Sequence, residues 1–179
     1  MIKVYKPRGF KQWFEIYKLY QRAFPNGERK PFSIIWEMCR KGKTDVWYCE
    51  KDGAFAGLAT TINSEKMILL DYFAVSKKLR GGGVGTAFLA ELLKQYDGCG
   101  VFGEIESTLD SEAADMPTRL RRKRFYLSGG MSETGIEAYL FGVRMELLTY
   151  KCDIDFESYK AFYSDNYGKA AARNVLPVK

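Results

Sequence analysis

A chain of 179 residues is long enough for one domain with a full hydrophobic core and short for two. Hydrophobic residues make up 46% of the chain and charged residues 28%, which excludes a disordered protein, and no apolar run approaches the roughly 20 residues that a membrane span needs. The formal net charge of +6 suits an anionic ligand, which could be nucleic acid, a phosphorylated cofactor or acidic lipid.

The first part of the chain is expected to form two helices and then a β-hairpin. Apolar residues at positions 10, 13, 14, 17, 20 and 24 have helical spacing, and Pro25-Asn26-Gly27 ends the helix. Lys51-Asp52-Gly53 is typical of a hairpin turn. The predicted elements are therefore helices over residues 10–24 and 31–39 and strands over residues 45–49 and 54–62.

The middle of the chain predicts a buried strand, a glycine-rich bend and a helix. Residues 66–75 (KMILLDYFAV) form a nearly continuous apolar run, which favours a central strand buried on both faces. Residues 79–88 (LRGGGVGTAF) hold four glycines within five positions, and residues 84–96 form an amphipathic helix that stops before Asp97-Gly98.

The rest of the chain predicts three further strands and two helices. Asp115 and Pro117 can open a helix that Gly129-Gly130 closes. The predicted strands cover residues 100–106, 136–139 and 143–150, with helices over residues 115–127 and 156–163. We expect a mixed α/β domain over residues 1–151 and a polar, aromatic C-terminal tail over residues 152–179, with one helix packed on the domain.

The glycine cluster has the chemistry of a phosphate cradle. A helix N-terminus has unpaired N–H groups and the positive end of the helix dipole, and glycines let phosphate oxygens approach the backbone. A plain turn without a ligand is the alternative. A dinucleotide fingerprint is weakened because Phe88 stands where it needs glycine, and a Walker A loop is excluded because no lysine follows the glycines.

Cysteine and histidine usage restricts the chemistry. The four cysteines are widely spaced without a CxxC pair, and no signal peptide precedes them, so we expect reduced thiols in a cytoplasmic protein. The chain has no histidine, which removes the commonest metal ligand and the commonest general base. We expect no metal site, and any catalysis must use carboxylates, tyrosine or backbone groups.

Two motifs in the correct order resemble the GCN5-related N-acetyltransferase (GNAT) family. The segment from Val75 to Gly85, VSKKLRGGGVG, is similar to the family signature V-x4-[QR]-G-x-G-x-[GA], with a strand before it and a helix after it. RFYLSGGM, from Arg124 to Met131, resembles the later FYxxxGF segment, with methionine where phenylalanine is usual. The resemblance spans about residues 2–151 and implies a mixed, mostly antiparallel sheet whose central strands splay apart.

The resemblance implies acetyl-coenzyme A (acetyl-CoA) as the acetyl donor. Its pyrophosphate would lie on N–H groups of the glycine bend, and its pantetheine arm beside the preceding strand. The acetyl carbonyl would accept a strand N–H, which polarises the thioester. The implied cofactor-binding residues are Phe73, Ala74, Val75, Arg80, Gly81, Gly82, Gly83, Val84, Gly85 and Thr86.

Acyl transfer to an amine also needs proton transfer. Tyr126 matches the family tyrosine near the sulfur, and its ordinary pKa of about 10 lets it protonate a departing thiolate whose thiol has a pKa of about 8.5. The alternative is a core tyrosine. Candidate bases are Asp71, Glu104 and Glu106, with Glu106 favoured and Asp71 next. These carboxylates could instead bind a substrate cation or pair with arginines, and a single base is not a requirement.

The sequence therefore predicts an N-acetyltransferase that moves an acetyl group from acetyl-CoA to a primary amine of a small molecule or peptide, by direct transfer in a ternary complex. The alternative is a non-catalytic module of the same fold that senses coenzyme A or binds a partner.

Residues 119–124 (RLRRKR) could bind nucleic acid, but they have no nucleic-acid motif. They are better interpreted as a solvated helix face, with Leu120 and Leu127 toward the core. We expect no membrane partner, and an exposed final strand could pair in a homodimer.

Overall fold

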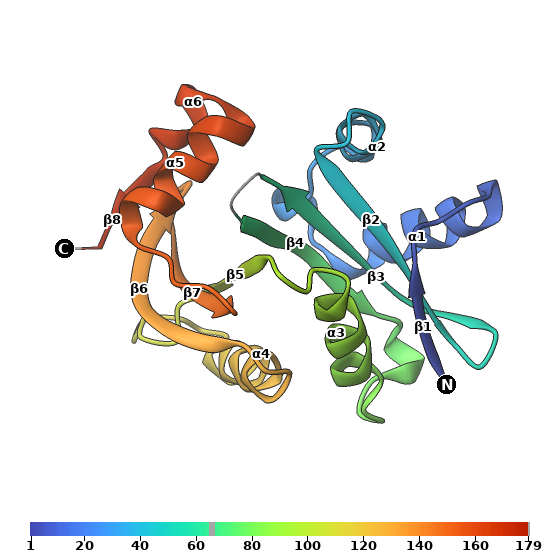
Figure 1. The fold of residues 1–179 in the computed structure, drawn as a ribbon. Coiled ribbons are helices and arrows are strands. Elements are labelled where there is room, and N and C mark those ends of the chain that lie inside the picture. The colour runs from blue at the N-terminus through green and yellow to red at the C-terminus, as the bar shows by residue number, and fades with distance from the viewer. Residues whose placement is uncertain (65–66, 179) are drawn as a thin grey trace. The chain divides into compact units, whose positions relative to one another are not determined.

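The computed structural model describes residues 1–64 and 67–178 (Figure 1). The described residues form six α-helices, two short 3-10 helices and eight strands. The strand pairs β1–β2, β2–β3, β5–β7, β6–β7 and β6–β8 are antiparallel. The expected mixed α/β class with a mostly antiparallel sheet is confirmed. Lys66, at the start of the strand predicted over residues 66–75, and Lys179, at the end of the predicted tail, lie outside the described residues.

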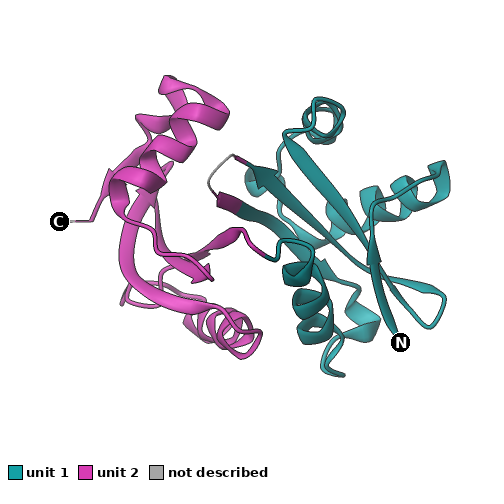
Figure 2. Cartoon of the chain, in the orientation of Figure 1, with its two compact units in different colours: residues 1–63, 69–97 teal, residues 64–68, 98–179 magenta. Residues whose placement is uncertain are grey.

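The chain divides into two compact units (Figure 2). Unit 1 comprises Met1–Asn63 and Leu69–Asp97, and unit 2 comprises Ser64–Ile68 and Gly98–Lys179. The elements of unit 1, in chain order, are β1 (Ile2–Tyr5), α1 (Phe10–Ala23), η1 (Asn26–Glu28), α2 (Phe32–Arg40), β2 (Thr44–Lys51), β3 (Ala54–Asn63), β4 (Met67–Val75, from Leu69 onward), η2 (Lys77–Leu79) and α3 (Val84–Lys94).

The strands of unit 1 lie in the order β1-β2-β3-β4. The predicted hairpin joins β2 to β3, and its two turn residues, Asp52 and Gly53, both have positive φ, 50° and 83°. Two positive φ values are typical of a type I′ turn, whose twist matches that of antiparallel strands. β1 was not predicted, because a four-residue strand carries little periodic signal, and it pairs with β2.

Helices cover both faces of the unit 1 sheet. Ile16 and Tyr20 of α1 and Ile35 of α2 are buried in a cluster with inward residues of β2, β3 and β4. α3 packs on the opposite face, where Phe88 stacks on Phe73 with ring centroids 4.6 Å apart. Successive side chains of a strand point to opposite faces of the sheet, so Phe73 points away from the face that carries Tyr72. This alternation explains why β4 contacts helices on both faces.

Unit 2 contains the strands β5 (Gly100–Glu106), β6 (Ser132–Leu140), β7 (Val143–Tyr150) and β8 (Val175–Pro177) and the helices α4 (Met116–Ser128), α5 (Phe156–Tyr167) and α6 (Lys169–Ala172). Its strand order is β5-β7-β6-β8. β7 therefore lies between β5 and β6, and the last strand of the chain, β8, lies at the edge of the sheet.

Helices also cover both faces of the unit 2 sheet. On one face, Tyr126 and Leu127 of α4 pack against Ile105 and Leu148. On the other, Phe102 makes an edge-to-face contact with Phe162 of α5, with ring centroids 4.9 Å apart.

Residues 152–178 contribute more structure than the single helix predicted for the tail. They form α5, α6 and β8, and Tyr159 and Val175 are completely buried.

The prediction that Leu120 of α4 faces the core is wrong, because its side chain is 41% exposed.

Close approach of backbone explains one glycine in unit 1. A Cβ atom on Gly57 of β3 would lie 2.6 Å from the carbonyl oxygen of Ala74 and 3.3 Å from the Phe88 ring. Ala74 belongs to the end of β4, just before the glycine bend, so the absence of a side chain at Gly57 sets where that strand end and α3 lie on the sheet.

We predict that Gly57→Ala destabilises the protein by about 2 kcal/mol, because overpacking against backbone cannot relax by side-chain rotation. Thermal unfolding followed by circular dichroism measures this as a melting temperature several degrees lower. Gly27→Ala is the matched control, since no heavy atom lies within 4 Å of its Cβ position. Equal stability of the two variants would contradict the proposed constraint.

Candidate active site

The glycine cluster forms an open bend between β4 and α3. Gly81 and Gly83 have left-handed backbone angles, with φ of 82° and 74°, which favour glycine over other residues. A Cβ atom on Gly81, Gly82 or Gly83 would meet no described heavy atom within 4 Å beyond the immediate chain neighbours. The bend therefore presents its backbone to open space, and no side chain of the described residues fills it.

Backbone N–H groups converge where the bend enters α3. Gly83 is the N-cap residue, and its carbonyl accepts the Ala87 N–H at 3.0 Å. The N–H groups of Val84, Gly85 and Thr86 belong to the first helical turn, which has no intrahelical acceptors, and no side chain of the described residues caps this end. The helix dipole adds positive potential here. These groups suit a diphosphate.

Arg80 adds a positioned positive charge beside the bend. Its Nε donates a hydrogen bond to the carbonyl of Val75 at 3.0 Å, which fixes the guanidinium at the end of β4. Among the described residues, no carboxylate forms an ion pair with Arg80. Its charge is therefore available to an anionic ligand.

The strand residues predicted to flank the cofactor lie next to this bend. Ala74 and Val75 are buried, and Phe73 is held by its stacking on Phe88 of α3. The sequence-predicted residues from Phe73 to Thr86 thus form one continuous strand–bend–helix segment of unit 1.

Asp71, one of the two favoured candidate bases, forms an ion pair within unit 1. Lys30 Nζ lies 2.8 Å from each of its carboxylate oxygens, and 12% of the Asp71 side chain is exposed. The backbone of Lys30 is itself fixed, because its N–H donates to the Tyr72 hydroxyl at 3.1 Å and its carbonyl accepts from Tyr20 at 3.0 Å. No pattern in the sequence links Asp71 to this partner, 41 positions away.

Glu106, the other favoured base, is paired with arginines of α4. Arg122 Nη1 donates to Glu106 Oε2, and Arg119 Nη2 lies 4.0 Å from Glu106 Oε1. Arg119 also pairs with Asp110 and Asp115. The arginine pairing that the sequence offered as an alternative for the carboxylates is thus present at Glu106.

Glu104 has a partner that sequence reasoning missed. The hydroxyl of Tyr163, on α5, donates to Glu104 Oε1 at 2.8 Å. Burial, and then the negative charge of Glu104, raise the pKa of Tyr163 well above 10, so the phenol stays protonated and keeps donating. Helical spacing located this segment, but nothing in the sequence links a residue of the C-terminal region to β5, 59 positions earlier.

Tyr126 is a half-buried residue near the end of α4. It packs against the cluster of Ile105, Met131 and Leu148, and its carbonyl accepts the Met131 N–H at 3.1 Å. Burial raises the pKa of Tyr126 to about 12, although the charge of Arg122 acts in the opposite direction. Tyr126 is therefore a neutral phenol, able to donate a proton, over the whole physiological pH range.

A family model for the acetyltransferase (GNAT) family matches residues 13–126. The chain belongs to this family. The match covers the glycine bend of unit 1 and extends to Tyr126 in unit 2. No curated protein matches the sequence significantly.

Solved structures support the GNAT fold. A GNAT-family protein from Bacteroides thetaiotaomicron has a TM-score of 0.76 at 17% identity, over 96% of this chain and 98% of that one. The Escherichia coli ribosomal-protein-S18-alanine N-acetyltransferase has a TM-score of 0.56 at 16% identity, over 87% and 96% of the two chains. Arabidopsis thaliana Naa50, solved with the bisubstrate analogue CoA-Ac-MVNAL, has a TM-score of 0.63 at 13% identity, over 84% and 99%.

In this GNAT chain, the basic helix α4 is held by ion pairs on its inner side. Lys123, only 13% exposed, lies 2.8 Å from Glu133 of β6 and 2.5 Å from Glu146 of β7. With Arg119 and Arg122 also paired, three of the cations in residues 119–124 are already neutralised by carboxylates of unit 2. This pairing anchors the helix that carries Tyr126, and it weakens the nucleic-acid interpretation.

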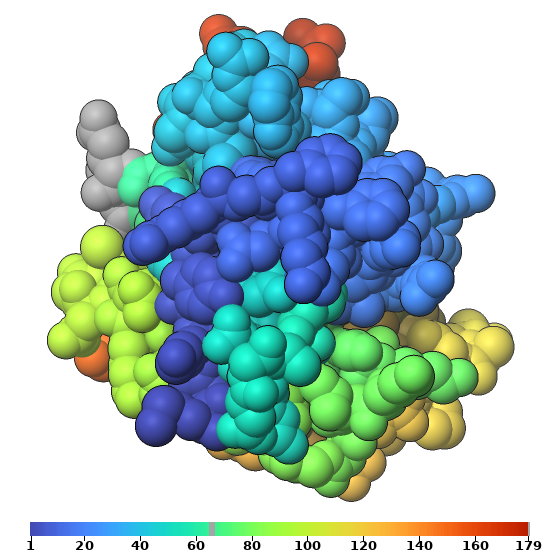
Figure 3. All heavy atoms as spheres, turned by 90° about the vertical axis from the view of Figure 1, so that its right-hand side faces the viewer, coloured from blue at the N-terminus to red at the C-terminus, as the bar shows by residue number. Residues whose placement is uncertain are grey.

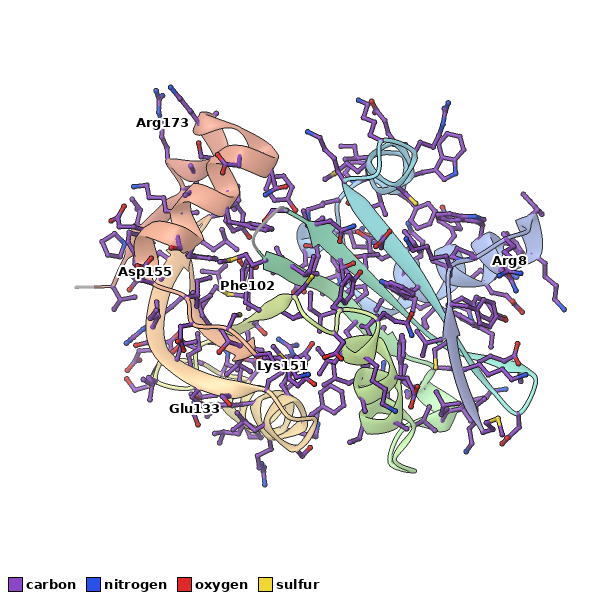
Figure 4. The ribbon with its side chains drawn as sticks, viewed as in Figure 1. Arg8, Phe102, Glu133, Lys151, Asp155 and Arg173 are labelled. Atoms are coloured by element: carbon purple, nitrogen blue, oxygen red, sulfur yellow. The ribbon has the colours of Figure 1, made fainter. Side chains whose placement is uncertain are left out.

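None of the predicted site residues lines either of two cavities. One of about 530 Å³ in unit 2 has a polar lining that includes Glu133 and Lys151 (Figure 4). The other, of about 340 Å³, is an aromatic groove in unit 1. Among the described residues, no three metal-ligating side chains come together, and no helix is both long enough and apolar enough to cross a bilayer.

We predict that Lys123→Met destabilises the protein by roughly 2–3 kcal/mol, because it leaves Glu146 buried without its cation; the partial exposure of Lys123 keeps the loss below that of a fully buried pair. Arg121→Met, at an exposed position of the same helix, is the control and should be nearly neutral. Urea unfolding measures both.

We predict that the pair of Lys123 and Glu146 makes the stability of the protein depend on pH in the acidic range. Burial acts to raise the pKa of Glu146, but hydrogen bonds from Lys123 and Thr108 outweigh it, and the net pKa is lowered from 4.5. Its stabilising contribution is therefore complete above pH 4.5 and is lost as the pH falls through the lower folded-state pKa. Glu146→Gln should flatten this part of the stability–pH curve, and an unchanged slope would contradict the pairing.

Proposed function

We propose that this GNAT-family protein is an acetyl-CoA-dependent N-acetyltransferase that transfers the acetyl group directly to a primary amine of a small molecule or peptide. The observation that carries the proposal is the open glycine bend at the N-terminus of α3, where no side chain of the described residues caps the helix and Arg80 lies beside the bend. The co-crystallised analogue of Naa50, in which coenzyme A is joined to a peptide, supports direct transfer in a ternary complex.

The diphosphate of the donor would bind the bend. N–H groups from Gly81 to Thr86 would donate to its oxygens, and Arg80 would contribute charge-assisted hydrogen bonds. Gly81 and Gly83 have left-handed φ, and no Cβ atom at these positions would stand in the way of a diphosphate. The residues present therefore fit the anionic part of coenzyme A.

When bound, the thioester supplies the activated acetyl group. The residues Phe73, Ala74 and Val75 would lie along the pantetheine arm, and a backbone N–H of this strand would donate to the acetyl oxygen and stabilise the negative charge that develops there. The stacked Phe88 keeps Phe73, and with it this strand end, in place.

Tyr126 would donate the proton that the departing sulfur needs. This role follows from its position in the second family motif. It is supported by the raised pKa of about 12, which keeps the phenol protonated.

Asp71 and Glu106 remain the candidates for receiving the proton of the attacking amine, directly or through water. Each already forms ion pairs, Asp71 with Lys30 and Glu106 with Arg122. A role as base therefore requires exchange of a partner, and removal of the proton by water is an equally simple route.

That pairing also favours a second candidate function, a coenzyme A sensor that binds the donor without turnover. A sensor needs the bend but no base. The two functions share the diphosphate site and differ in their dependence on Tyr126.

We predict that Gly82→Asp weakens acetyl-CoA binding at least about tenfold, because a carboxylate beside the diphosphate replaces attraction by repulsion while the open space leaves the fold intact. Gly27→Asp introduces the same charge at another open position of unit 1 and serves as the control. Isothermal titration calorimetry measures both. Equal affinity of the two variants for acetyl-CoA would refute the proposed diphosphate site at the glycine bend. No binding of acetyl-CoA to the wild type at high micromolar concentration would refute it as well.

We predict that Tyr126→Phe lowers turnover about 10²-fold or more while the affinity for acetyl-CoA stays within twofold, because only proton donation is lost. Release of free thiol, measured over a panel of amine acceptors, provides the rate. The wild-type rate should show no decline from Tyr126 ionisation below pH 10, given its pKa of about 12. A wild type that binds acetyl-CoA but acetylates no amine would instead support the sensor.

A further inference from the structure

α1 of unit 1 has a second apolar face that does not belong to the core. Ile16 and Tyr20 bury one side of the helix completely. Phe10, Phe14 and Tyr17, at helical spacing i, i+4, i+7, lie on the surface, and Phe10 is 86% exposed. Exposed rings in a continuous stripe are unusual for a protein surface and indicate an interaction site.

Together with α2, this stripe lines a groove of about 340 Å³. Six aromatic side chains line it, namely Phe10, Trp13, Phe14, Tyr17, Phe32 and Trp36. The rings of Trp13 and Tyr17 meet Phe32 edge to face, with centroids 6.2 Å and 5.3 Å apart, so these contacts connect α1 and α2 along the groove. Figure 3 faces the side of unit 1 on which α1 and α2 lie, in blue and light blue.

Positive charge surrounds the aromatic groove. Residues 1–43 contain 11 Lys and Arg against 3 Asp and Glu, a net charge of +8, whereas residues 44–179 carry 17 against 19, a net charge of −2. Arg8 (Figure 4), Lys11 and Lys18 are exposed on or just before α1, and Lys18 Nζ lies 4.2 Å from the ring of Phe14. Arg40 sits over Trp36 in the same way, at 5.0 Å.

Two of the three acidic residues of this region already have partners. Glu15 accepts a hydrogen bond from Tyr48 at 2.8 Å, and Glu37 pairs with Lys41 at 2.6 Å. The charge around the groove therefore complements an anionic partner. A second copy of the chain would bring a second rim of cations to the same place, and the repulsion disfavours self-association.

We propose that the aromatic groove docks an acidic amphipathic helix of a partner protein. Apolar side chains on one face of that helix would enter the groove, and flanking carboxylates would meet Lys11, Lys18 and Arg40. The concave shape favours a helix over a bilayer, because a flat lipid surface would contact only the protruding rings. This inference does not depend on acetyl transfer.

Fluorescence anisotropy with the full chain tests the proposal. The probe is a labelled peptide of about 18 residues with Leu and Phe at i, i+3, i+4 and i+7 and Glu at the flanking positions. We expect micromolar binding that weakens with added salt. Replacing the Glu residues of the probe by Gln should weaken binding at least tenfold.

Two variants of the protein separate the apolar from the charged contribution. Phe14→Ser with Trp36→Ser should abolish binding, while Phe141→Ser, which removes a 60% exposed phenylalanine from the β6–β7 hairpin, should change nothing. Lys11→Glu with Lys18→Glu should lower the affinity for the acidic probe at least tenfold. The same variant should raise the affinity for a probe with Lys in place of Glu. This charge swap keeps the test valid if the aromatic variant fails to fold.

Four results would overturn the proposal. They are no anisotropy change at millimolar protein, equal affinity for the acidic and the neutral probe, sedimentation with phosphatidylserine vesicles in place of peptide binding, and dimerisation that Phe14→Ser abolishes. Acetyl-CoA affinity, measured on the same variants, should be unchanged, so that failure here is distinguishable from failure of the proposed function.

Discussion

The proposed chemistry of this chain depends on a glycine-rich stretch of backbone. Where β4 passes into α3, glycines with left-handed φ present successive N–H groups to open space, and the N-terminus of α3 follows at once. Peptide N–H groups are weak donors individually, but several directed at one point, with a helix dipole behind them, bind an anion strongly. Much of the rest of unit 1 holds this arrangement in place: Gly57 lets the end of β4 approach β3, Phe73 stacks on α3, and Arg80 is tied back to Val75.

Unit 2 shows a different use of charge. The sequence favoured a solvated helix face for the basic run on α4, yet Arg119, Arg122 and Lys123 form ion pairs with carboxylates of the same unit. The charges fix the helix that carries Tyr126. The surroundings of the half-buried Tyr126 disfavour the phenolate, so its pKa is raised. The phenol of Tyr126 therefore stays protonated near neutral pH.

The sequence predicted those parts of the structure that are local. The strand–bend–helix segment, the Asp52-Gly53 turn and the limits of α4 each depend on neighbours within a few positions, and each was found. The features that the sequence did not predict depend on partners far away along the chain. β1 and β8 are short and exist because β2 and β6 pair with them, and the Glu104–Tyr163 bond joins residues 59 positions apart. The apolar period of α1 predicted a helix correctly but could not show that Phe10 and Phe14 remain outside the core.

The central claim is that N–H groups of the bend hold the diphosphate, and amide chemical shifts test it most directly. In a ¹H–¹⁵N correlation spectrum titrated with acetyl-CoA, the amide protons from Gly81 to Thr86 should show the largest changes and move downfield, as expected for charge-assisted hydrogen bonds. Saturating acetyl-CoA that shifts other amides while leaving those six in place would contradict the account.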